Sequence, residues 1–283
     1  MAATVSCVIR AYNEEQWIGK LLDSLGAQES YAGSLEVIVV DSGSTDRTAQ
    51  IAGDKGARVI SIRKEHFTYS SALNRGIAEC TGSLVVILSA HSIPGGPDWL
   101  GRMVGRFGAD ERVAGVYCRQ VPWPDALCIE TVRVRKRFSD RSQVFCDGDL
   151  RGMCFSNAGS CIRRSTWQSH PFVELPAAED REWALWSISQ GFKIVYEASA
   201  CIYHSHNDSA RQAAQRQIQL ERGLDCRIAR KRSRILTLRQ TAGMMVRGIR
   251  LIGACREHRH QRLKSLAHVF GQSYWYLKDF DKR

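Results

Sequence analysis

The sequence predicts an α/β protein, with a mainly parallel sheet flanked by helices and then a basic helical extension. Short apolar runs alternate with helical stretches of about 10–15 residues through residue 116. The run at 35–40 is rich in β-branched residues and ends abruptly in Asp41, as a buried parallel strand does. From Arg211 onward, 18 Lys and Arg stand against 5 Asp and Glu, a balance of +13, whereas residues 1–210 carry −2.

The first half of the chain predicts strands and helices in strict alternation. The helix expected at 14–25 has its apolar stripe at Trp17, Ile18, Leu21, Leu22 and Leu25. Ser44 or Thr45 would cap a second helix that begins near Asp46 and runs through Ala52. A third helix is expected at 71–79, and the strands are expected at 4–10, 35–40, 58–62 and 84–88.

After residue 116 the rhythm changes. The Pro-bracketed segment 121–124 leads to a basic helix at 131–141, a strand at 160–163, a helix at 180–189 and a strand at 193–197. Longer irregular connections are typical of a substrate-binding half. Ligands of parallel sheets collect at the carboxyl ends of the strands. Tyr12, Asn13, Asp41 and the run 89–92 are therefore the candidate site residues.

From about residue 207 the chain reads as helical. Six apolar residues are ringed by Arg247, Arg250 and Arg256; they are Met244, Met245, Val246, Ile249, Leu251 and Ile252. Such a helix can lie on an anionic membrane surface, which we favour. It can also pack on its own domain or on a second copy of the chain, or bind nucleic acid. No run of 18 apolar residues occurs, so we expect no membrane span.

The ten cysteines are scattered and none forms a Cys-x-x-Cys pair. We expect reduced, mostly buried thiols of a cytosolic protein, rather than a disulfide framework or a zinc site. Met1 leads straight into a strand, so no signal peptide is expected. No glycine-rich phosphate loop follows a strand, which argues against a dehydrogenase or a P-loop enzyme.

Four ordered motifs resemble the family 2 glycosyltransferases, which have the GT-A fold. They are Ala11-Tyr-Asn-Glu-Glu15, Asp41-Ser-Gly-Ser-Thr-Asp46, Ala72-Leu-Asn-Arg-Gly76 and Ala178-Glu-Asp-Arg-Glu-Trp183. The resemblance runs through about residue 206. Within the family the chain looks most like bacterial rhamnosyltransferase-type members, in segments 67–76, 88–94 and 196–206.

The resemblance implies a GT-A domain at 1–206, with a nucleotide-binding half at 1–116 and an acceptor-binding half at 117–206, followed by a basic helical region at 207–283. It implies an inverting transfer of a sugar from a UDP- or dTDP-sugar to a glycan or lipid-linked acceptor, in cell-surface polysaccharide synthesis. The enzyme would be cytoplasmic and peripheral at the membrane, and its C-terminal helices could also join two copies of the chain.

The resemblance also implies roles for individual residues. Asp41 would accept the imide N–H of the nucleobase. Arg75 would reach the nucleotide with its guanidinium fork, or be an ordinary surface residue of a helix. The remaining residues expected at the substrate are Ala11, Tyr12, Asn13, Glu14, Ser42, Ser89 and Ala90.

On the acceptor side, the resemblance assigns Asp180 as the general base that takes the proton of the acceptor hydroxyl. Its neighbour Glu179 would disfavour ionisation of both groups and raise a pKa. The two acids can equally be a helix N-terminal pair that stabilises the dipole. Trp183 would offer a face for sugar stacking or for packing.

The chain departs from the family at the fourth strand, where most members have Asp-x-Asp for a divalent cation. Here the sequence is Ser89-Ala90-His91. His91, with His204 or His206, is expected to hold Mn²⁺ or Mg²⁺. The alternative is an enzyme without metal, in which His91 or basic residues hold the diphosphate directly.

The missing acids also leave a second function open: a non-catalytic nucleotide-sugar-binding relative, or a partner subunit of such an enzyme. A nucleic-acid-binding protein would use the basic region, but little aromatic residue content accompanies it before 274–276. A nucleotidyltransferase on a similar sheet would need the glycine loop that the first turn lacks.

Overall fold

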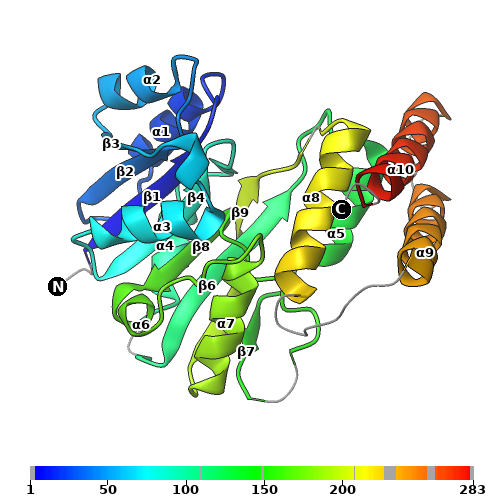
Figure 1. The fold of residues 1–283 in the computed structure, drawn as a ribbon. Helices are drawn as coiled ribbons and strands as arrows, with labels where there is room; N and C mark the ends of the chain where they lie inside the picture. The colour runs from blue at the N-terminus through cyan, green and yellow to red at the C-terminus, as the bar shows by residue number, and fades with distance from the viewer. Residues whose placement is uncertain are drawn as a thin grey trace. The chain divides into compact units, whose positions relative to one another are not determined.

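The structure is a computed structural model that describes residues 4–108, 110–147, 150–206, 208–225, 234–253 and 259–280. These residues form one nine-stranded sheet in the order β3-β2-β1-β4-β8-β6-β9-β5, and β7 also pairs with β9 (Figure 1). The strands are β1 (Val5–Ala11), β2 (Leu35–Asp41), β3 (Arg58–Ser61), β4 (Leu84–Ser89), β5 (Ile93–Pro94), β6 (Val113–Val121), β7 (Gln143–Phe145), β8 (Gly159–Arg163) and β9 (Lys193–Tyr203).

The helices alternate with the strands in the first half and dominate the end of the chain. They are α1 (Ile18–Gly26), α2 (Thr48–Asp54), α3 (Tyr69–Ala78), α4 (Trp99–Gly105), α5 (Cys128–Arg137), α6 (Arg164–Ser169), α7 (Glu179–Ser189), α8 (Ala210–Asp225), α9 (Arg234–Gly253) and α10 (Arg259–Phe280), with a short 3₁₀ turn at Lys64–His66.

The chain divides into two compact units. The first comprises Met1–Val121, Phe138–Glu174 and Glu179–His204, and holds the sheet. The second comprises Pro122–Arg137, Leu175–Ala178 and Ser205–Arg283, and holds α5 with α8, α9 and α10. The helix near 131–141 that the sequence predicted therefore belongs with the C-terminal helices.

Strand direction brings many strand ends to one edge of the sheet. β1, β2, β3 and β4 are parallel, and Ala11 lies in register with Asp41. β8 runs antiparallel to β4 and to β6, so the residues before Gly159 lie beside the end of β4. β9 is parallel to β6 and pairs Tyr203 with Val121. The polar residues that follow β1, β2, β4, β6 and β9 therefore share one edge.

The predicted strands of the first half are confirmed, and the buried apolar residues of β2 and β4 are part of the reason. Val39, Val86 and Leu88 are fully buried in the core of the sheet unit. Burial of such side chains stabilises the folded state by about 1.5–3 kcal/mol each. A continuous apolar run is thus the signature of a strand covered on both faces.

Two helix starts differ from the sequence expectation. α1 begins at Ile18, because Glu14 starts a turn whose carbonyl accepts the Trp17 and Ile18 N–H groups (both 2.9 Å). Ser44 and Thr45 do not cap α2, which begins at Thr48. The Asp46 carboxylate accepts the Thr48 N–H at 2.9 Å instead.

The cysteine expectation holds for most described positions but not for all. Cys7, Cys80, Cys118 and Cys161 are free and buried, and burial raises the pKa of each thiol. Cys128, in contrast, is disulfide-bonded, so the prediction of a thiol is wrong there.

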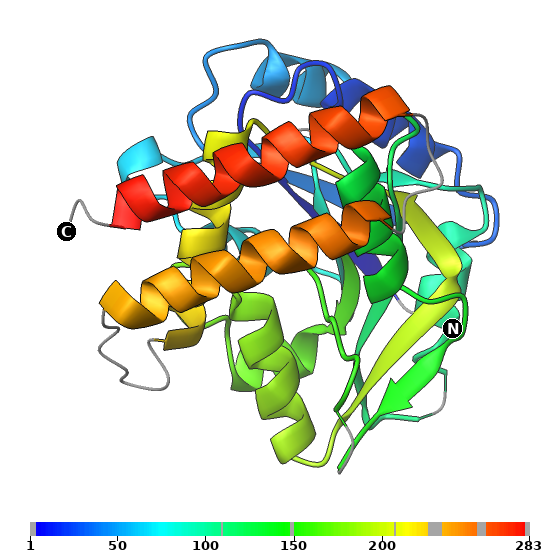
Figure 2. The ribbon, with the colours of Figure 1, turned by 90° about the vertical axis from the view of Figure 1, so that its right-hand side faces the viewer.

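In the helical unit, α9 and α10 lie side by side and run in opposite directions (Figure 2). Ile252 and Val269 meet Ile129 of α5 in one apolar cluster. A second cluster joins Ala214 and Ile218 of α8 to residues of α10. Part of the predicted apolar cluster is therefore used for packing within the unit. Within the described part of the chain, no helix is long and apolar enough to cross a membrane.

Candidate functional site

Asp41 closes β2 and organises the turn that follows it. Its side chain is buried, and Oδ2 accepts the N–H groups of Gly43 (3.2 Å) and Ser44 (3.1 Å) while Oδ1 accepts the Ser44 hydroxyl (2.5 Å). A carboxylate has about four acceptor positions, so one remains on Oδ1 for a ligand. Ser42 is also buried, and its N–H donates to the Ala11 carbonyl at 2.9 Å.

Asn13 ties the end of β1 to this turn. Its φ of 53° lies in the left-handed region, which Asn tolerates better than most residues. Its side-chain Oδ1 accepts the Thr45 N–H, and its own N–H donates to the Ser44 hydroxyl, both at 2.8 Å. The structure thus gives Asn13 a part in holding the loop, whatever it contacts in a ligand.

Tyr12 presents an aromatic ring beside Asn13. The side chain is 40% exposed, and Lys64 donates to its hydroxyl at 2.7 Å, with the ammonium 4.7 Å from the ring centroid. An exposed ring at a strand end can stack on a planar base. Lys64 was not singled out from the sequence, because nothing in its own neighbourhood there links it to Tyr12.

Of the two interpretations left open for Arg75, the structure favours the surface residue. Its side chain is 59% exposed on α3 and pairs with Glu79 one turn later, at 3.6 Å. Arg10 was not predicted, yet it lies at the end of β1, in register with Ser89. Only 14% of its side chain is exposed, and its guanidinium lies 4.9 Å from the Tyr69 ring centroid.

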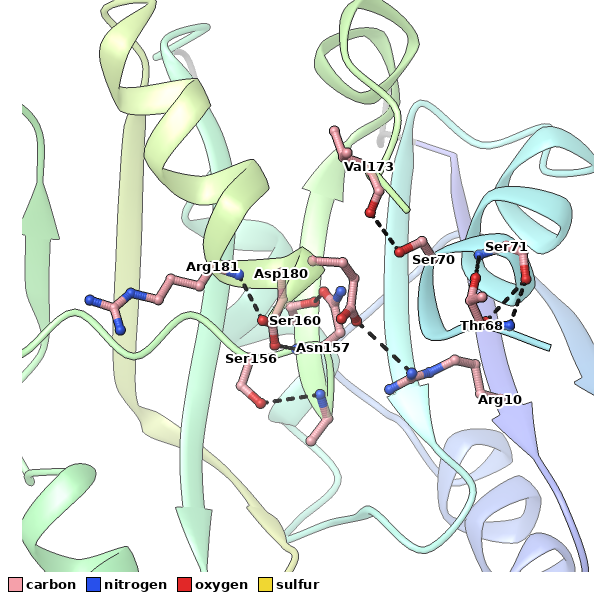
Figure 3. Close-up of polar contacts among 12 residues, drawn as sticks. Arg10, Thr68, Ser70, Ser71, Ser156, Asn157, Ser160, Val173, Asp180 and Arg181 are labelled. Atoms are coloured by element: carbon pink, nitrogen blue, oxygen red, sulfur yellow. Dashed lines mark hydrogen bonds and ion pairs between the residues drawn. The ribbon is translucent and has the colours of Figure 1, made fainter. Parts of the chain in front are cut away.

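Glu179 and Asp180 open α7, and Figure 3 shows Asp180 beside Asn157. Arg10 Nη1 lies 4.0 Å from Glu179 Oε1. Asp180 Oδ2 accepts the Asn157 N–H at 3.3 Å, and Oδ1 accepts the Arg181 N–H at 2.7 Å. Ala178, just before the pair, has φ of 69°, a strained value for alanine. The acid pair is therefore both a helix N-terminal pair and part of the polar edge.

Glu179 is buried, and its pKa is raised to about 7. Burial is the main cause, the Asp180 charge adds to it, and the Arg10 charge opposes both. A raised pKa in this position agrees with the expectation from the adjacent acids.

Trp183 packs rather than stacks on a ligand. Its side chain is fully buried, and its ring lies 5.7 Å from the Phe155 ring and 5.9 Å from the Phe172 ring. A ring without exposed surface cannot stack on a sugar, so its assignment to the substrate site is corrected. About one turn earlier on α7, Asp180 keeps part of its surface exposed.

The three predicted histidines come together. His91, His204 and His206 each offer one ligand atom, and these atoms all lie within 4.8 Å of one another. The rings of His91 and His204 are stacked, with centroids 5.1 Å apart. His91 Nδ1 lies 2.7 Å from Glu14 Oε1, and His204 Nδ1 lies 3.0 Å from Gln120 Oε1. Imidazole nitrogens suit divalent transition-metal ions such as Zn²⁺, Fe²⁺ and Ni²⁺, so the donor set fits a divalent cation.

Gln120 connects the histidines to the acid pair. Its side-chain amide donates to the Ser156 hydroxyl at 3.1 Å, and Ser156 precedes Asn157, whose N–H reaches Asp180. Ala90, between Ser89 and His91, is buried and donates its N–H to the Arg10 carbonyl at 3.0 Å. Contacts of Gln120, Ser156 and Asn157 therefore lead from His204 to Asp180.

Sequence reasoning missed Arg10, Gln120, Ser156 and Asn157. Arg10 and Gln120 share a signal that could have found them: each is a polar residue that closes an apolar strand. Ser156 and Asn157 carry no such signal, because they act at this edge only through the antiparallel pairing of β8.

The family described as "Glycosyl transferase family 2" matches residues 6–160. An O-antigen chain rhamnosyltransferase of Salmonella typhimurium is 30% identical over 221 residues, which are 75% of this chain and 69% of that protein. One from Salmonella anatum is 29% identical over 64% of this chain and 60% of that protein.

A solved structure with a similar fold is a mannosyltransferase from Pyrobaculum calidifontis in complex with GDP-mannose and Mn²⁺. It is 18% identical, covers 100% of this chain and 89% of its own, and has a TM-score of 0.66.

Proposed function

The chain belongs to glycosyltransferase family 2 and has the GT-A fold, and from this premise we propose that it transfers a sugar, with inversion, from a UDP- or dTDP-sugar to a hydroxyl of a glycan or lipid-linked acceptor. The similarity to O-antigen rhamnosyltransferases supports a deoxyhexose donor and a role in cell-surface polysaccharide synthesis. The single observation that carries the proposal is that Asn157, Ser156 and Gln120 link Asp180 to His204, whose ligand atom lies within 4.8 Å of those of His91 and His206.

In this mechanism Asp180 is the general base. It accepts the proton of the acceptor hydroxyl while that oxygen bonds to the anomeric carbon. The bond from the anomeric carbon to the diphosphate oxygen breaks, and the diphosphate leaves with the electron pair. Hydrogen bonds from the Asn157 and Arg181 N–H groups orient the Asp180 carboxylate.

The nucleoside is held at the other end of the edge. Asp41 uses its remaining acceptor position for the base N–H, and Tyr12 stacks on the ring. Ala11, Asn13 and Ser42 shape the turn around them. His91, His204 and His206 would hold the divalent cation, which when bound neutralises charge on the leaving diphosphate. Mn²⁺ in a structure of the same fold agrees with such a cation.

Calorimetry with UDP, dTDP and GDP tests the proposal. We expect wild type to bind one pyrimidine nucleoside diphosphate at micromolar concentration in the presence of Mn²⁺, and His91→Ala to lose the metal dependence. Tight nucleotide binding that is the same with and without metal would agree with a transferase, but it would contradict the metal-binding role of the histidines. Absence of binding by any of the three nucleotides would contradict the proposal and favour the non-catalytic relative.

Arg10 and Arg75 make a matched pair for locating the diphosphate. We assign the diphosphate contact to Arg10, because it lies on the site edge while Arg75 pairs with Glu79 on the surface. Arg10→Gln should weaken nucleoside diphosphate binding at least about 10-fold and monophosphate binding much less, since a charge-assisted hydrogen bond contributes about 1.5–3 kcal/mol.

Arg75→Gln is the control and should change neither affinity by more than about twofold. The ratio of diphosphate to monophosphate affinity is the measurement, because a structural defect would lower both equally. A loss confined to Arg75→Gln would reverse the assignment.

We also propose that the enzyme works peripherally on the cytoplasmic face of a membrane, and the outer faces of α9 and α10 support this. Val246 and Ile249 of α9 are 47% and 45% exposed. Leu263, Phe270 and Tyr274 of α10 are 55%, 50% and 56% exposed, at spacings that place them on one helix face. α9 has no Asp or Glu and α10 has only Asp279. Exposed apolar stripes with basic flanks match an anionic lipid surface.

A further inference from the structure

Glu14 and Gln120 each contact the Nδ1 atom of a candidate metal ligand, His91 and His204 respectively. Glu14 Oε1 lies 2.7 Å from His91 Nδ1, and Gln120 Oε1 lies 3.0 Å from His204 Nδ1. Both rings are largely or wholly buried, with 23% of the His91 side chain and 7% of His204 exposed. Glu14 was expected at the substrate, and its carboxylate contacts His91.

We propose that Glu14 and Gln120 are positioning residues that fix His91 and His204 as Nε2 metal ligands, and that the resulting all-nitrogen site selects a transition-metal ion over Mg²⁺. This inference rests on the proposed metal site and deepens it.

The hydrogen bonds determine which ring nitrogen is available. An ionised carboxylate and an amide carbonyl oxygen only accept, so Nδ1 of each ring carries the proton and donates it. The lone pair is then on Nε2 in both rings. Outer partners of this kind set the tautomer and orientation of metal-bound histidines, and their loss typically weakens metal affinity 10–100-fold.

The donor set determines the class of metal. Among described residues, the group that could hold an ion consists of His91, His204 and His206 alone, with no carboxylate among them. Mg²⁺ binds oxygen ligands, whereas imidazole suits Fe²⁺, Ni²⁺, Cu²⁺ and Zn²⁺, and the affinity of a given site for divalent ions rises from Mn²⁺ to Co²⁺ and Ni²⁺. Replacement of Asp-x-Asp by Ser89-Ala90-His91 is thus a change of metal preference, with nitrogen donors in place of oxygen donors.

Gln120 contacts both a candidate metal ligand and the loop next to Asp180. Its carbonyl oxygen accepts from His204, and its NH₂ donates to Ser156, next to Asn157. One side chain thereby sets the position of a metal ligand relative to the loop that orients Asp180. Gln120→Ala should make the positions of both His204 and the loop before Asn157 less fixed, whereas Gln120→Glu keeps an acceptor for His204.

Titration of the purified full chain with Co²⁺ alone and Mg²⁺ alone tests the inference, by calorimetry and by the visible absorption of bound Co²⁺. We expect Co²⁺ to bind at least about 10-fold more tightly than Mg²⁺. Glu14→Ala and Gln120→Ala should each weaken Co²⁺ binding about 10–100-fold and alter the absorption band. Glu14→Gln and Gln120→Glu, which keep an acceptor, should stay within about threefold of wild type.

Glu15→Ala is the matched control, because Glu15 is half-exposed and pairs with Arg47 rather than with a histidine; its Co²⁺ affinity should equal that of wild type. Equal losses in the Ala and the acceptor-keeping variants would overturn the positioning role. Tighter binding of Mg²⁺ than of Co²⁺ would overturn the selectivity. If the chain binds no Co²⁺ but binds a nucleoside diphosphate without metal, this inference is wrong and the proposed transferase function is not contradicted.

Discussion

Replacing Asp180 with Asn is expected to lower the transfer rate about 10²–10⁴-fold, the usual contribution of a general base. Asn has the same shape, and its single amide oxygen can still accept one of the two N–H groups, from Asn157 or Arg181, that the two Asp180 oxygens accept, so the loop should stay in place. It cannot take a proton at neutral pH. The measurement is sugar transfer under saturating donor, with nucleotide affinity by calorimetry expected to change little.

Asp98→Asn provides the control, because Asp98 is an exposed aspartate that pairs with Arg102 on α4 and should leave the rate unchanged. An Asp180→Asn enzyme that retains more than about a tenth of the rate would show that another group is the base.

Glu179 should make this rate depend on pH near neutrality, because its pKa is raised to about 7 beside Asp180. Glu179→Gln mimics the protonated form and should remove that transition from the pH profile. Between the unfolded value near 4.5 and about 7, the folded state binds the extra proton. The contribution of Glu179 to the free energy of unfolding therefore falls as pH rises through this window. In Glu179→Gln, the free energy of unfolding should depend less steeply on pH over the same window.

Charging the outer face of α10 is expected to abolish membrane binding. Leu263 and Phe270 are half-exposed on one stripe, and full burial of such a side chain contributes about 1.5–3 kcal/mol. The double variant Leu263→Glu with Phe270→Glu also adds two negative charges near anionic lipid. Together these effects should weaken binding to phosphatidylglycerol-containing vesicles at least about 100-fold, measured by flotation.

Val144→Glu places the same charge on β7 of the sheet unit, at a side chain that is 60% exposed, and should bind vesicles as wild type does. Wild type should bind pure phosphatidylcholine vesicles at least about 10-fold more weakly. Failure to float with anionic vesicles would contradict the membrane surface. Self-association that the double variant abolishes, without vesicle binding, would identify the stripe as an interface between two copies.

The sequence predicts site residues only where a local motif or a strand end marks them. Asp41, Asp180 and the three histidines are predicted from the sequence because each stands in a motif or just after an apolar strand. Trp183 was assigned to a ligand face, although helix periodicity alone does not say which side of α7 enters the core. Arg75 matched a motif, whereas Arg10 has the buried position at the strand end.

Local patterning by itself determined the parallel strands, the helices between them and the basic helical end, because each depends on neighbours a few residues away. Tertiary structure alone decided which polar groups meet. His91 and His204 are 113 positions apart, and only the register of β6 with β9, beside β8 and β4, brings their rings to 5.1 Å. Glu14 reaches His91 through the pairing of β1 with β4, and Gln120 reaches His204 through that of β6 with β9, since a hydrogen bond between distant segments leaves no periodic signal in the chain.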